Sequence, residues 1–361
     1  MKLDTVGIPE TFTKVPLSDI QLSLLAGEID ELRSEVLKDL GEKDARYIRR
    51  ILKAVRYTEV SGRGFLFFGF FPPTWVLGTL LLSVSKILEN MELGHNVIHG
   101  QYDWMKDPSL NGKTYEWDIA GTASNWRKTH NFQHHTYTNI KGFDDDLGYG
   151  IIRLFPEQRW SVVNLFQPLY SVIFALLFQW GIAIQELRLG KVFKGKVPWQ
   201  RLRPELINVF KKIRYQVLKD YVFFPLIAGT NYLAVIAGNF TANIVRNVWT
   251  FTVIFCGHFT KDAQIFHRSV LDNESRGHWY FRQILGSSNL KGGKFLNIMT
   301  GNLSYQIEHH LFPDIPARRY SEMSVKVRAI CERYQIHYNS GSMISQFSQV
   351  IYRIFRYGLP V

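Results

Sequence analysis

Long uncharged apolar runs limit what this chain can fold into more than any other feature. Residues 64–85, GFLFFGFFPPTWVLGTLLLSVS, contain no charged side chain over 22 positions. At ~1.5 Å per helical residue, a run of this length can cross the ~30 Å hydrocarbon core of a bilayer. Pro72 and Pro73 interrupt the run, because proline breaks a helix and lacks an amide donor. The run therefore predicts either one kinked span or the tip of a helical hairpin whose arms extend to both sides.

Three more apolar runs follow, at residues 160–184, 221–240 and 248–259, and the short segment NIVRN separates the last two. Residues 186–219, between the runs at 160–184 and 221–240, are strongly basic. Such a basic segment is typical of the cytoplasmic side of a membrane protein. The pattern predicts an all-α integral membrane protein, with few transmembrane helices arranged as two hairpins below a cytoplasmic helical cap. The expected divisions are an N-terminal cytoplasmic helical segment (1–58), a membrane domain (59–345) and a C-terminal tail (346–361).

The run at 160–184 decides the topology. If this run and the two that follow it each cross once, the histidines near residue 130 and those near residue 309 lie on opposite faces. If those histidines share a metal site, one run does not cross. Pro168 makes 160–184 the best candidate, so we expect it to lie in the interface or to dip in and return. The alternative keeps it as a span and separates the histidines.

The average composition resembles that of a soluble protein, with 46% hydrophobic residues and 20% charged residues. The formal net charge is 43 − 31 = +12, but the basic residues form no single stripe with interleaved aromatics, and no nucleic-acid motif is present. We therefore expect no nucleic-acid partner. The only cysteines are Cys256 and Cys331, with no C-x-x-C, which excludes a disulfide-rich domain and an attached iron–sulfur domain. The N-terminus does not have the pattern of a secretory leader.

The 11 histidines are clustered along the chain. One pair lies four residues apart in GHNVIHG, and another lies four apart in HNFQHH. Residues at this spacing share a helix face, so each pair can present two imidazoles to one point. A third histidine directly next to such a pair points about 100° away and can reach a second metal. The candidate ligands are His95, His99, His130, His134, His135, His309 and His310.

Seven imidazoles are too many for one closed zinc site, which takes four ligands. Imidazole binds iron, copper, zinc and nickel, so the ligand type alone does not choose the metal. Two metals with open positions, in a site next to membrane segments, favour iron that activates oxygen.

The three clusters, H-x-x-x-H, H-x-x-x-H-H and Q-x-x-H-H, resemble the histidine boxes of integral-membrane fatty acid desaturases. The resemblance covers roughly residues 55–345 and is carried by KILENMELGHNVIHGQYDW, KTHNFQHHTYTN, GFDDDLGYG and YQIEHHLFPDIPARRY. These segments are most similar to bacterial acyl-CoA desaturases of the mycobacterial stearoyl-CoA delta-9 type. The resemblance implies a multi-pass protein of the bacterial inner membrane, in contact with membrane lipids, with its histidine boxes on the cytoplasmic side.

The third box begins with Gln306, where the family often has histidine, and an amide is a poor iron ligand beside imidazole. Gln306 is therefore expected to bind weakly or through water, and Asn302 is a second candidate for a water-mediated contact. His258, at the end of the last apolar run, is expected to complete the ligand set, since the family commonly has an additional ligand at such a place. Carboxylates normally orient metal-bound imidazoles, and the candidates for this role are Glu92, Asp103, Glu308 and Asp144. Trp104, Trp117 and Trp126 either line a substrate channel or anchor the chain at the interface.

The implied activity is that of an oxygen-dependent oxidoreductase. A two-iron centre with O2 as co-substrate would insert a cis double bond, at the delta-9 position, into a long-chain acyl-CoA or an acyl-lipid. No catalytic residue is expected beyond the metal ligands. The chain has no G-x-G-x-x-G and no His-Pro-Gly-Gly, so a separate ferredoxin or NAD(P)H reductase is expected to supply electrons. The alternatives are a di-iron acyl or alkyl hydroxylase and a non-enzymatic membrane metal-binding protein.

Overall fold

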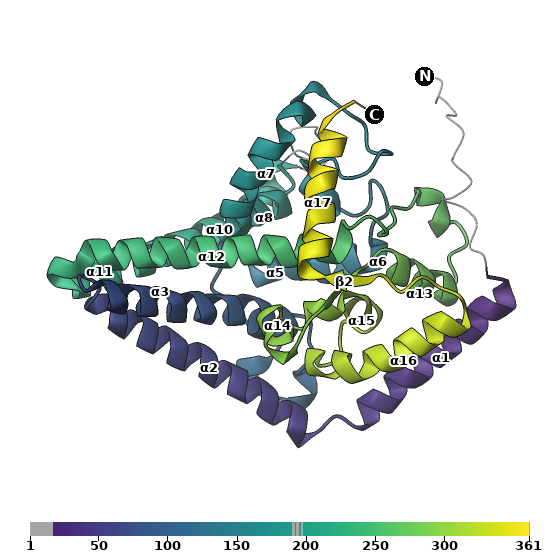
Figure 1. Ribbon diagram of the computed structural model, residues 1–361, viewed down its shortest axis with the longest axis horizontal. Helices are drawn as coiled ribbons and strands as arrows, with labels where there is room; N and C mark the ends of the chain where they lie inside the picture. Colours follow the sequence, from purple (N-terminus) through teal and green to yellow (C-terminus); the bar gives the residue numbers. More distant parts are fainter. Residues whose placement is uncertain (1–16, 190–191, 193–194, 196–197, 361) are drawn as a thin grey trace.

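The first apolar run forms the turn of a helical hairpin. The computed structural model describes residues 17–360 except 190–191, 193–194 and 196–197, and in it α2 (Glu42–Phe67) and α3 (Pro72–Ile87) pack side by side (Figure 1). A Cβ on Gly62 would lie 2.8 Å from the backbone nitrogen of Leu82, so glycine permits this close approach. Pro72 and Pro73 occupy the first turn of α3, where a missing amide donor costs no helical hydrogen bond. Of the two predicted arrangements, the hairpin is confirmed.

The second hairpin differs from the sequence prediction. Its first arm is α10 (Trp199–Leu218) with α11 (Phe224–Ile227), and a turn at 228–231 leads into α12 (Tyr232–His258). The prediction of two separate runs, 221–240 and 248–259, is wrong, because α12 continues unbroken through NIVRN. Arg246 does not end the helix, since its buried guanidinium donates to the side chains of Asn243 and Asn247.

Both hairpins extend to the same side of the molecule, and α12 packs along α3 (Figure 1). A buried polar cluster joins them. Asp220 accepts from Lys86 Nζ at 2.8 Å and from Arg63 Nη2 at 3.1 Å, and Arg63 also reaches Asn239 Oδ1 on α12 at 3.4 Å. Each of these side chains is at most 7% exposed. Asp220 is the carboxylate that both cations share, while Glu59 also pairs with Arg63 at 3.0 Å and Asp118 lies 3.9 Å from Lys86.

The run at 160–184 is not one straight helix. It folds into a 3-10 turn (Val162–Phe166), α7 (Gln167–Leu176) and α8 (Phe178–Glu186), with a 98° bend. Among the described helices, none is by itself both long and apolar enough to cross a membrane, whereas this bent pair, taken as a unit, meets that criterion.

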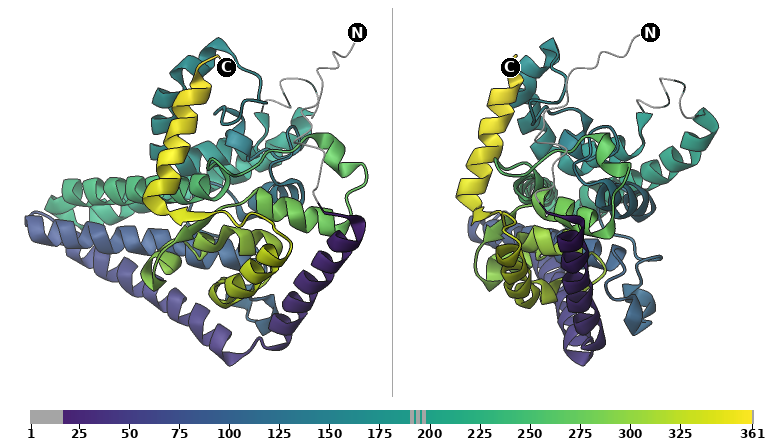
Figure 2. Two further views of the ribbon diagram at one scale, coloured as in Figure 1. Left: turned by 45° about the vertical axis from the view of Figure 1, so that its right-hand side comes forward. Right: turned by 90° about the vertical axis from the view of Figure 1, so that its right-hand side faces the viewer.

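A helical cap lies at the other end of the hairpins (Figures 1 and 2). Helix α1 (Asp19–Lys38) packs on α13 (Arg276–Leu285) and on α16 (Tyr320–Arg333), and α15 (Gln306–Leu311) fits between them. Their shared core includes Leu25, which is fully buried. Ser18 begins α1 with a capping box to Gln21.

The mostly helical fold class is confirmed, and the described residues add one small parallel sheet of β1 (Asn289–Lys291) and β2 (Ser340–Ser342). The short helices are α4 (Asn96–Ile98), α5 (Ala123–Trp126), α6 (His135–Tyr137) and α14 (Lys294–Met299), with π-helical segments at Leu88–His95, Arg127–His134 and Lys219–Phe223. Further 3-10 turns lie at Asp103–Met105, Pro108–Leu110, Leu147–Gly150, Gly229–Asn231, Arg268–Leu271, Leu303–Tyr305 and Ala317–Arg319.

The C-terminal helix is α17 (Met343–Gly358). It begins before residue 346, and helix α2 runs through residue 58 without a break. The predicted divisions at 58 and 345 therefore do not coincide with breaks in secondary structure. The division into 1–58, 59–345 and 346–361 stays a prediction.

Candidate metal centre

Two π-helical segments carry the first two histidine pairs. The segment Leu88–His95 leads into α4, directly before His99, and the segment Arg127–His134 follows α5 and ends at the second pair. A π-helical turn has i→i+5 hydrogen bonds and often marks a functional site, because it redirects side chains within a helix. The sequence spacing predicted ordinary helices here. The π-helical geometry has no sequence signal that we recognised.

Four histidines from three separate segments meet in a first group. The ligand nitrogens of His95, His99, His130 and His309 all lie within 4.8 Å of one another. The rings of His95 and His99 have centroids 4.6 Å apart, and the His309 ring lies 4.9 Å from the His95 ring. A single ion could therefore contact imidazoles from all three boxes.

A second group joins His134, His258 and His310, whose ligand nitrogens also lie within 4.8 Å of one another. The Nε2 atoms of His258 and His310 are 3.1 Å apart. His258 is the last residue of α12 and lies beside histidines of the second and third boxes. His130, His134 and Asp146 form a further overlapping group of the same kind.

His135 lies between the two main groups and belongs to neither by the distances of its nitrogens. Its ring centroid is 4.5 Å from that of His310, 4.7 Å from that of His309 and 4.8 Å from that of His99. Both ring nitrogens of His135 are buried without a hydrogen-bond partner. All seven box histidines and His258 are therefore neighbours in one cluster.

The donor atoms of this cluster fit a metal centre. The Nε2 atoms of five histidines are buried and have no hydrogen-bond partner; they belong to His99, His130, His134, His135 and His309. An unsatisfied buried polar group costs about 1–3 kcal/mol. Five such atoms aimed at one small region are explained if they coordinate metal ions, and two groups of imidazoles fit two ions.

Other ring nitrogens are held by neighbouring acceptors, which orients the imidazoles. His134 Nδ1 lies 3.0 Å from Asp144 Oδ2, and His130 Nδ1 lies 3.1 Å from Asp146 Oδ2. Asp144 is the carboxylate predicted for such a role, and Asp146 of the same acidic run makes an equivalent contact. Other groups that contact Nδ1 are Asn96 Oδ1 for His95, the Gly286 carbonyl for His258, the Tyr320 hydroxyl for His309 and Gln283 Oε1 for His310.

The other predicted carboxylates make different contacts. Glu92 accepts from Tyr47 Oη at 2.7 Å and from Asn302 Nδ2 at 2.9 Å, and burial raises the pKa of Glu92 to about 8. Glu308 accepts from Asn289 Nδ2 at 2.9 Å and from the Tyr338 hydroxyl at 2.9 Å, and burial raises its pKa to about 7. Asp103 accepts from the Gly112 amide at 2.6 Å. Within the described part of the chain, no hydrogen bond links these three carboxylates to a box histidine.

Gln306 and Asn302 lie at different places relative to the cluster. Gln306 Nε2 is 2.9 Å from His258 Nε2, and Gln306 Oε1 is buried without a partner. Gly257 makes room for Gln306, since a Cβ there would lie 3.0 Å from Gln306 Cδ. The side chain of Asn302 is engaged with Glu92 and Tyr47. The metal-binding roles of both residues stay predictions.

The electrostatics keep most of the imidazoles neutral. Burial lowers the pKa of His95 to about 4. Burial also lowers the pKa of five others well below the usual value; they are His99, His130, His135, His309 and His310. His134 differs: burial opposes its protonation, but the carboxylates of Asp144 and Asp146 together outweigh burial and raise the pKa of His134. Neutral imidazoles have the lone pair that a metal ion requires.

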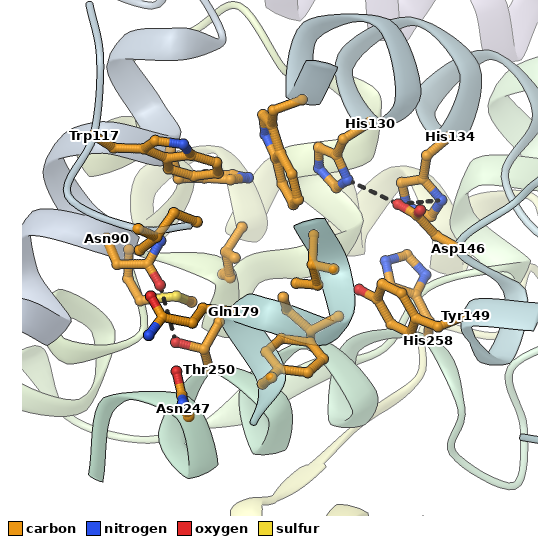
Figure 3. A pocket seen from close by; sticks show the side chains of 18 of the residues that line it. Asn90, Trp117, His130, His134, Asp146, Tyr149, Gln179, Asn247, Thr250 and His258 are labelled. Carbon is orange, nitrogen blue, oxygen red and sulfur yellow. Dashed lines mark hydrogen bonds and ion pairs between the residues drawn. The ribbon is translucent and has the colours of Figure 1, made fainter. Parts of the chain in front are cut away.

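A narrow, mostly apolar pocket lies beside the cluster (Figure 3). His130, His134 and His258 lie at one end, and the other end has polar groups that include Asn90 and Thr250. Apolar and aromatic side chains form most of the wall between them, among them Ile119, Trp117, Trp126, Phe178, Ile182 and Ile254. Of the three predicted tryptophans, Trp104 is not part of the wall.

Comparison with known proteins agrees with this site. A family model described as fatty acid desaturase matches residues 71–342. A protein named NADPH-dependent stearoyl-CoA 9-desaturase from Mycobacterium tuberculosis is 46% identical over 95% of this chain and 82% of its own length. A protein named sn-1 linoleoyl-lipid 6-desaturase from Synechocystis is 28% identical over 74% of this chain and 75% of its own length. The chain belongs to the fatty acid desaturase family.

Proposed function

We propose that this protein inserts a cis double bond at the delta-9 position of a long-chain acyl-CoA, with O2 as co-substrate. One observation carries the proposal: two groups of histidines lie at one end of a mostly apolar pocket. Several of their ring nitrogens are buried without a hydrogen-bond partner. The similar mycobacterial protein named stearoyl-CoA 9-desaturase supports this choice of substrate and position.

The proposed cofactor is a pair of iron ions. The first histidine group (His95, His99, His130 and His309) would hold one ion, the second (His134, His258 and His310) the other, and His135 lies where it can join either. When bound, the iron pair supplies the oxygen-activating redox chemistry that an unactivated C–H bond requires.

The chain's own residues position the substrate and exclude water. Trp126 stacks on His130 with ring centroids 4.0 Å apart and is 4% exposed, so it seals the metal side of the cavity with an apolar surface. Trp117 packs against Trp126 at 5.0 Å and donates its indole N–H to the Gly121 carbonyl, which fixes its ring. A rigid wall next to the metal centre holds one stretch of acyl chain there, and such positioning determines which bond reacts.

A cleft beside the segment Arg127–His134 supports an acyl-CoA substrate over an acyl-lipid substrate. Its wall includes the basic residues Arg127, Lys128 and Arg188 together with the aromatic residues Tyr137 and Phe143. Lys128 is paired only at the surface, with Glu205 at 2.9 Å, and its side chain is 64% exposed. Cations and aromatic rings together suit a head group that has phosphates and a purine base.

The electron donor is proposed to be a separate ferredoxin or NAD(P)H-dependent reductase, as the absence of flavin and nicotinamide motifs from the sequence predicts. The basic run at 186–219 would face the cytoplasm, where an acidic donor can approach it.

The proposed location is the bacterial inner membrane, with the apolar turn ends of the two hairpins inserted, and with the basic run at 186–219 and the histidine cap on the cytoplasmic side. Large apolar side chains are exposed around both hairpin turns, among them Phe68, Phe70, Phe71, Phe223, Leu226, Ile227 and Leu233. Exposed apolar patches of this extent mark contact surfaces, and a lipid bilayer is the partner that suits two hairpin turns on one side.

Product analysis tests the proposed activity. Iron-loaded protein in vesicles would receive stearoyl-CoA, O2, NADPH and a ferredoxin–reductase pair, and the acyl product would be analysed by mass spectrometry. We expect a product two mass units lighter than the substrate, with the double bond at carbon 9, and no product when the donor proteins are left out. A product sixteen units heavier would establish a hydroxylase instead, and turnover with NADPH alone would contradict the external donor.

A further inference from the structure

The C-terminal helix α17 presents an apolar face to the outside. The exposed fractions are 82% for Ile344, 64% for Tyr352, 58% for Phe355 and 53% for Leu359. The first three of these, with Ser348 and Ile351 between them, recur every three to four residues and therefore share one helix face, and Leu359 follows directly after the helix. A helix on the surface of a protein in water normally has the opposite arrangement, with polar side chains outside.

Polar contacts hold the inner side of α17, so the apolar face cannot turn inward. Gln346 Nε2 donates to Ser288 Oγ at 2.8 Å, and Arg353 Nη2 donates to the Lys261 carbonyl at 2.8 Å. At the end of the helix, Trp160 Nε1 donates to the Gly358 carbonyl at 2.9 Å, and Arg153 Nη1 donates to the Tyr357 carbonyl at 3.1 Å. Side chains thus satisfy carbonyls that a free helix end leaves to water.

The apolar face continues onto the neighbouring helix. Helix α7 and the 3-10 turn before it pack against α17, and Gln167 Nε2 donates to the Ile354 carbonyl. The large apolar residues of this segment are also mostly exposed; they are Val162, Val163, Phe166, Leu169, Val172 and Ile173. Two packed helices therefore share one extended apolar surface.

The two helices run across the direction of the hairpins. In Figure 1 and in the left view of Figure 2, α17 lies roughly perpendicular to α12, and in Figure 1 α7 runs beside α17. If the hairpins enter a bilayer, α7 and α17 lie along its surface, where an amphipathic helix buries its apolar face at the boundary of head groups and acyl chains. Arg159 and Arg356 are exposed beside this surface and suit anionic head groups.

We propose that α17 and α7 form an in-plane membrane-contact face, which binds a bilayer that contains anionic lipid. The proposal goes beyond the desaturase activity and rests only on the proposed insertion of the hairpins. It assigns the C-terminal helix the role of fixing the height and tilt of the histidine cap above the membrane.

Site-specific labels test this face. Both native cysteines are buried, so a bimane label attaches selectively to Ser348→Cys on α17 or to the matched control Ser34→Cys on exposed α1, with the unsubstituted protein as the labelling blank. Each full-length variant is reconstituted in phosphatidylcholine–phosphatidylglycerol vesicles. We expect nitroxide-labelled lipid to quench the label at position 348 severalfold more than the label at position 34, and aqueous iodide to show the reverse order. Ile344→Cys provides a second position on the same face.

Three results would overturn the proposal. Equal iodide quenching at positions 348 and 34 places the α17 face in water. Protection of position 348 from both quenchers, together with a doubled mass in light scattering, assigns the face to a second copy of the chain. Sedimentation of unquenched protein apart from the vesicles shows that the hairpins do not insert. Desaturase turnover of each labelled variant is measured in the same samples, so that failure of this face and failure of the proposed activity are distinguished.

Discussion

Individual histidines in the cluster use their two ring nitrogens differently. In His130 and His134, Nδ1 contacts a carboxylate while Nε2 is left unpaired in the centre of the cluster. This division fixes the tautomer and the ring orientation before any metal arrives. Coordination thus requires little rearrangement of the side chains.

Asp144→Asn tests the orienting role at this scale. The amide can still accept one hydrogen bond but no longer stabilises the imidazole by charge, so iron affinity is expected to fall about 10- to 100-fold. Iron content is measured by mass spectrometry after dialysis against a graded chelator. The matched control is Asp262→Asn, an exposed carboxylate far from the box histidines in sequence, which should retain wild-type iron. Equal iron retention in both variants would contradict the role of Asp144.

His258→Ala tests the ligand that lies outside the boxes. Its Nε2 is part of the second histidine group, so the variant should lose iron from that group and lose turnover. His337→Ala is the matched control, because the His337 side chain is 62% exposed. Full iron content and full activity in His258→Ala would show that His258 is not a ligand.

Much of the site was predictable at the residue scale, because spacing in the sequence reveals side chains on one short segment. The box histidines follow from spacing, and His258 followed from family resemblance and its place at the end of an apolar run. Asn96, Gln283 and the Gly286 carbonyl were not predictable as partners. Their contacts depend on how loops pack, and an amide or a backbone carbonyl has no distinctive sequence signal.

Individual elements are shaped by buried polar groups more than the sequence suggested. Arg246 looked like a break between two apolar runs, yet it lies inside α12, where its two terminal nitrogens donate to Asn243, Asn247 and the Asp118 carbonyl. The run at 160–184 shows the opposite case. Its sequence is uncharged throughout, yet the helix axis bends by 98° at Leu177. Hydropathy locates apolar segments well, but it does not locate the bends within them.

Asp220→Asn tests how the two hairpins are joined. The substitution removes the buried carboxylate that Lys86 and Arg63 share and leaves them only Asp118 and Glu59, respectively. Because breaking a buried ion pair from one side costs about 3–5 kcal/mol when no other partner remains, we expect a loss of up to that size. Thermal unfolding of the protein in detergent should therefore begin at a clearly lower temperature. Glu42→Gln breaks the exposed pair between Glu42 and Arg46, which is worth less than about 1 kcal/mol, and serves as the control. Equal unfolding temperatures in the two variants would contradict the structural role of Asp220.

The whole molecule separates the apolar turn ends of the hairpins from a polar cap that holds the candidate metal site. This arrangement explains why the mean composition resembles that of a soluble protein, since the cap dilutes the apolar segments. The mostly helical class and the family were predictable from the sequence. The packing of α7 against α17 was not, because those segments are far apart in the chain.

Lys128→Ala tests whether the basic cleft that includes Lys128 binds the substrate. If the basic cleft binds the phosphates of acyl-CoA, loss of this exposed cation should raise KM for stearoyl-CoA by up to about tenfold, or ~1.4 kcal/mol, with kcat and iron content unchanged. Lys326→Ala, an exposed lysine on α16, is the control for a general charge effect. An unchanged KM in steady-state assays at low salt would remove the cleft from substrate binding.

The metal content of the purified full-length protein tests the central claim most directly. Protein from iron-supplemented cells, measured by inductively coupled plasma mass spectrometry against quantitative amino-acid analysis, is predicted to contain about two iron ions per chain. His95→Ala, His135→Ala and His310→Ala should each lose iron and turnover together. One zinc ion per chain, or two iron ions that all three variants retain, would contradict a histidine-held di-iron centre.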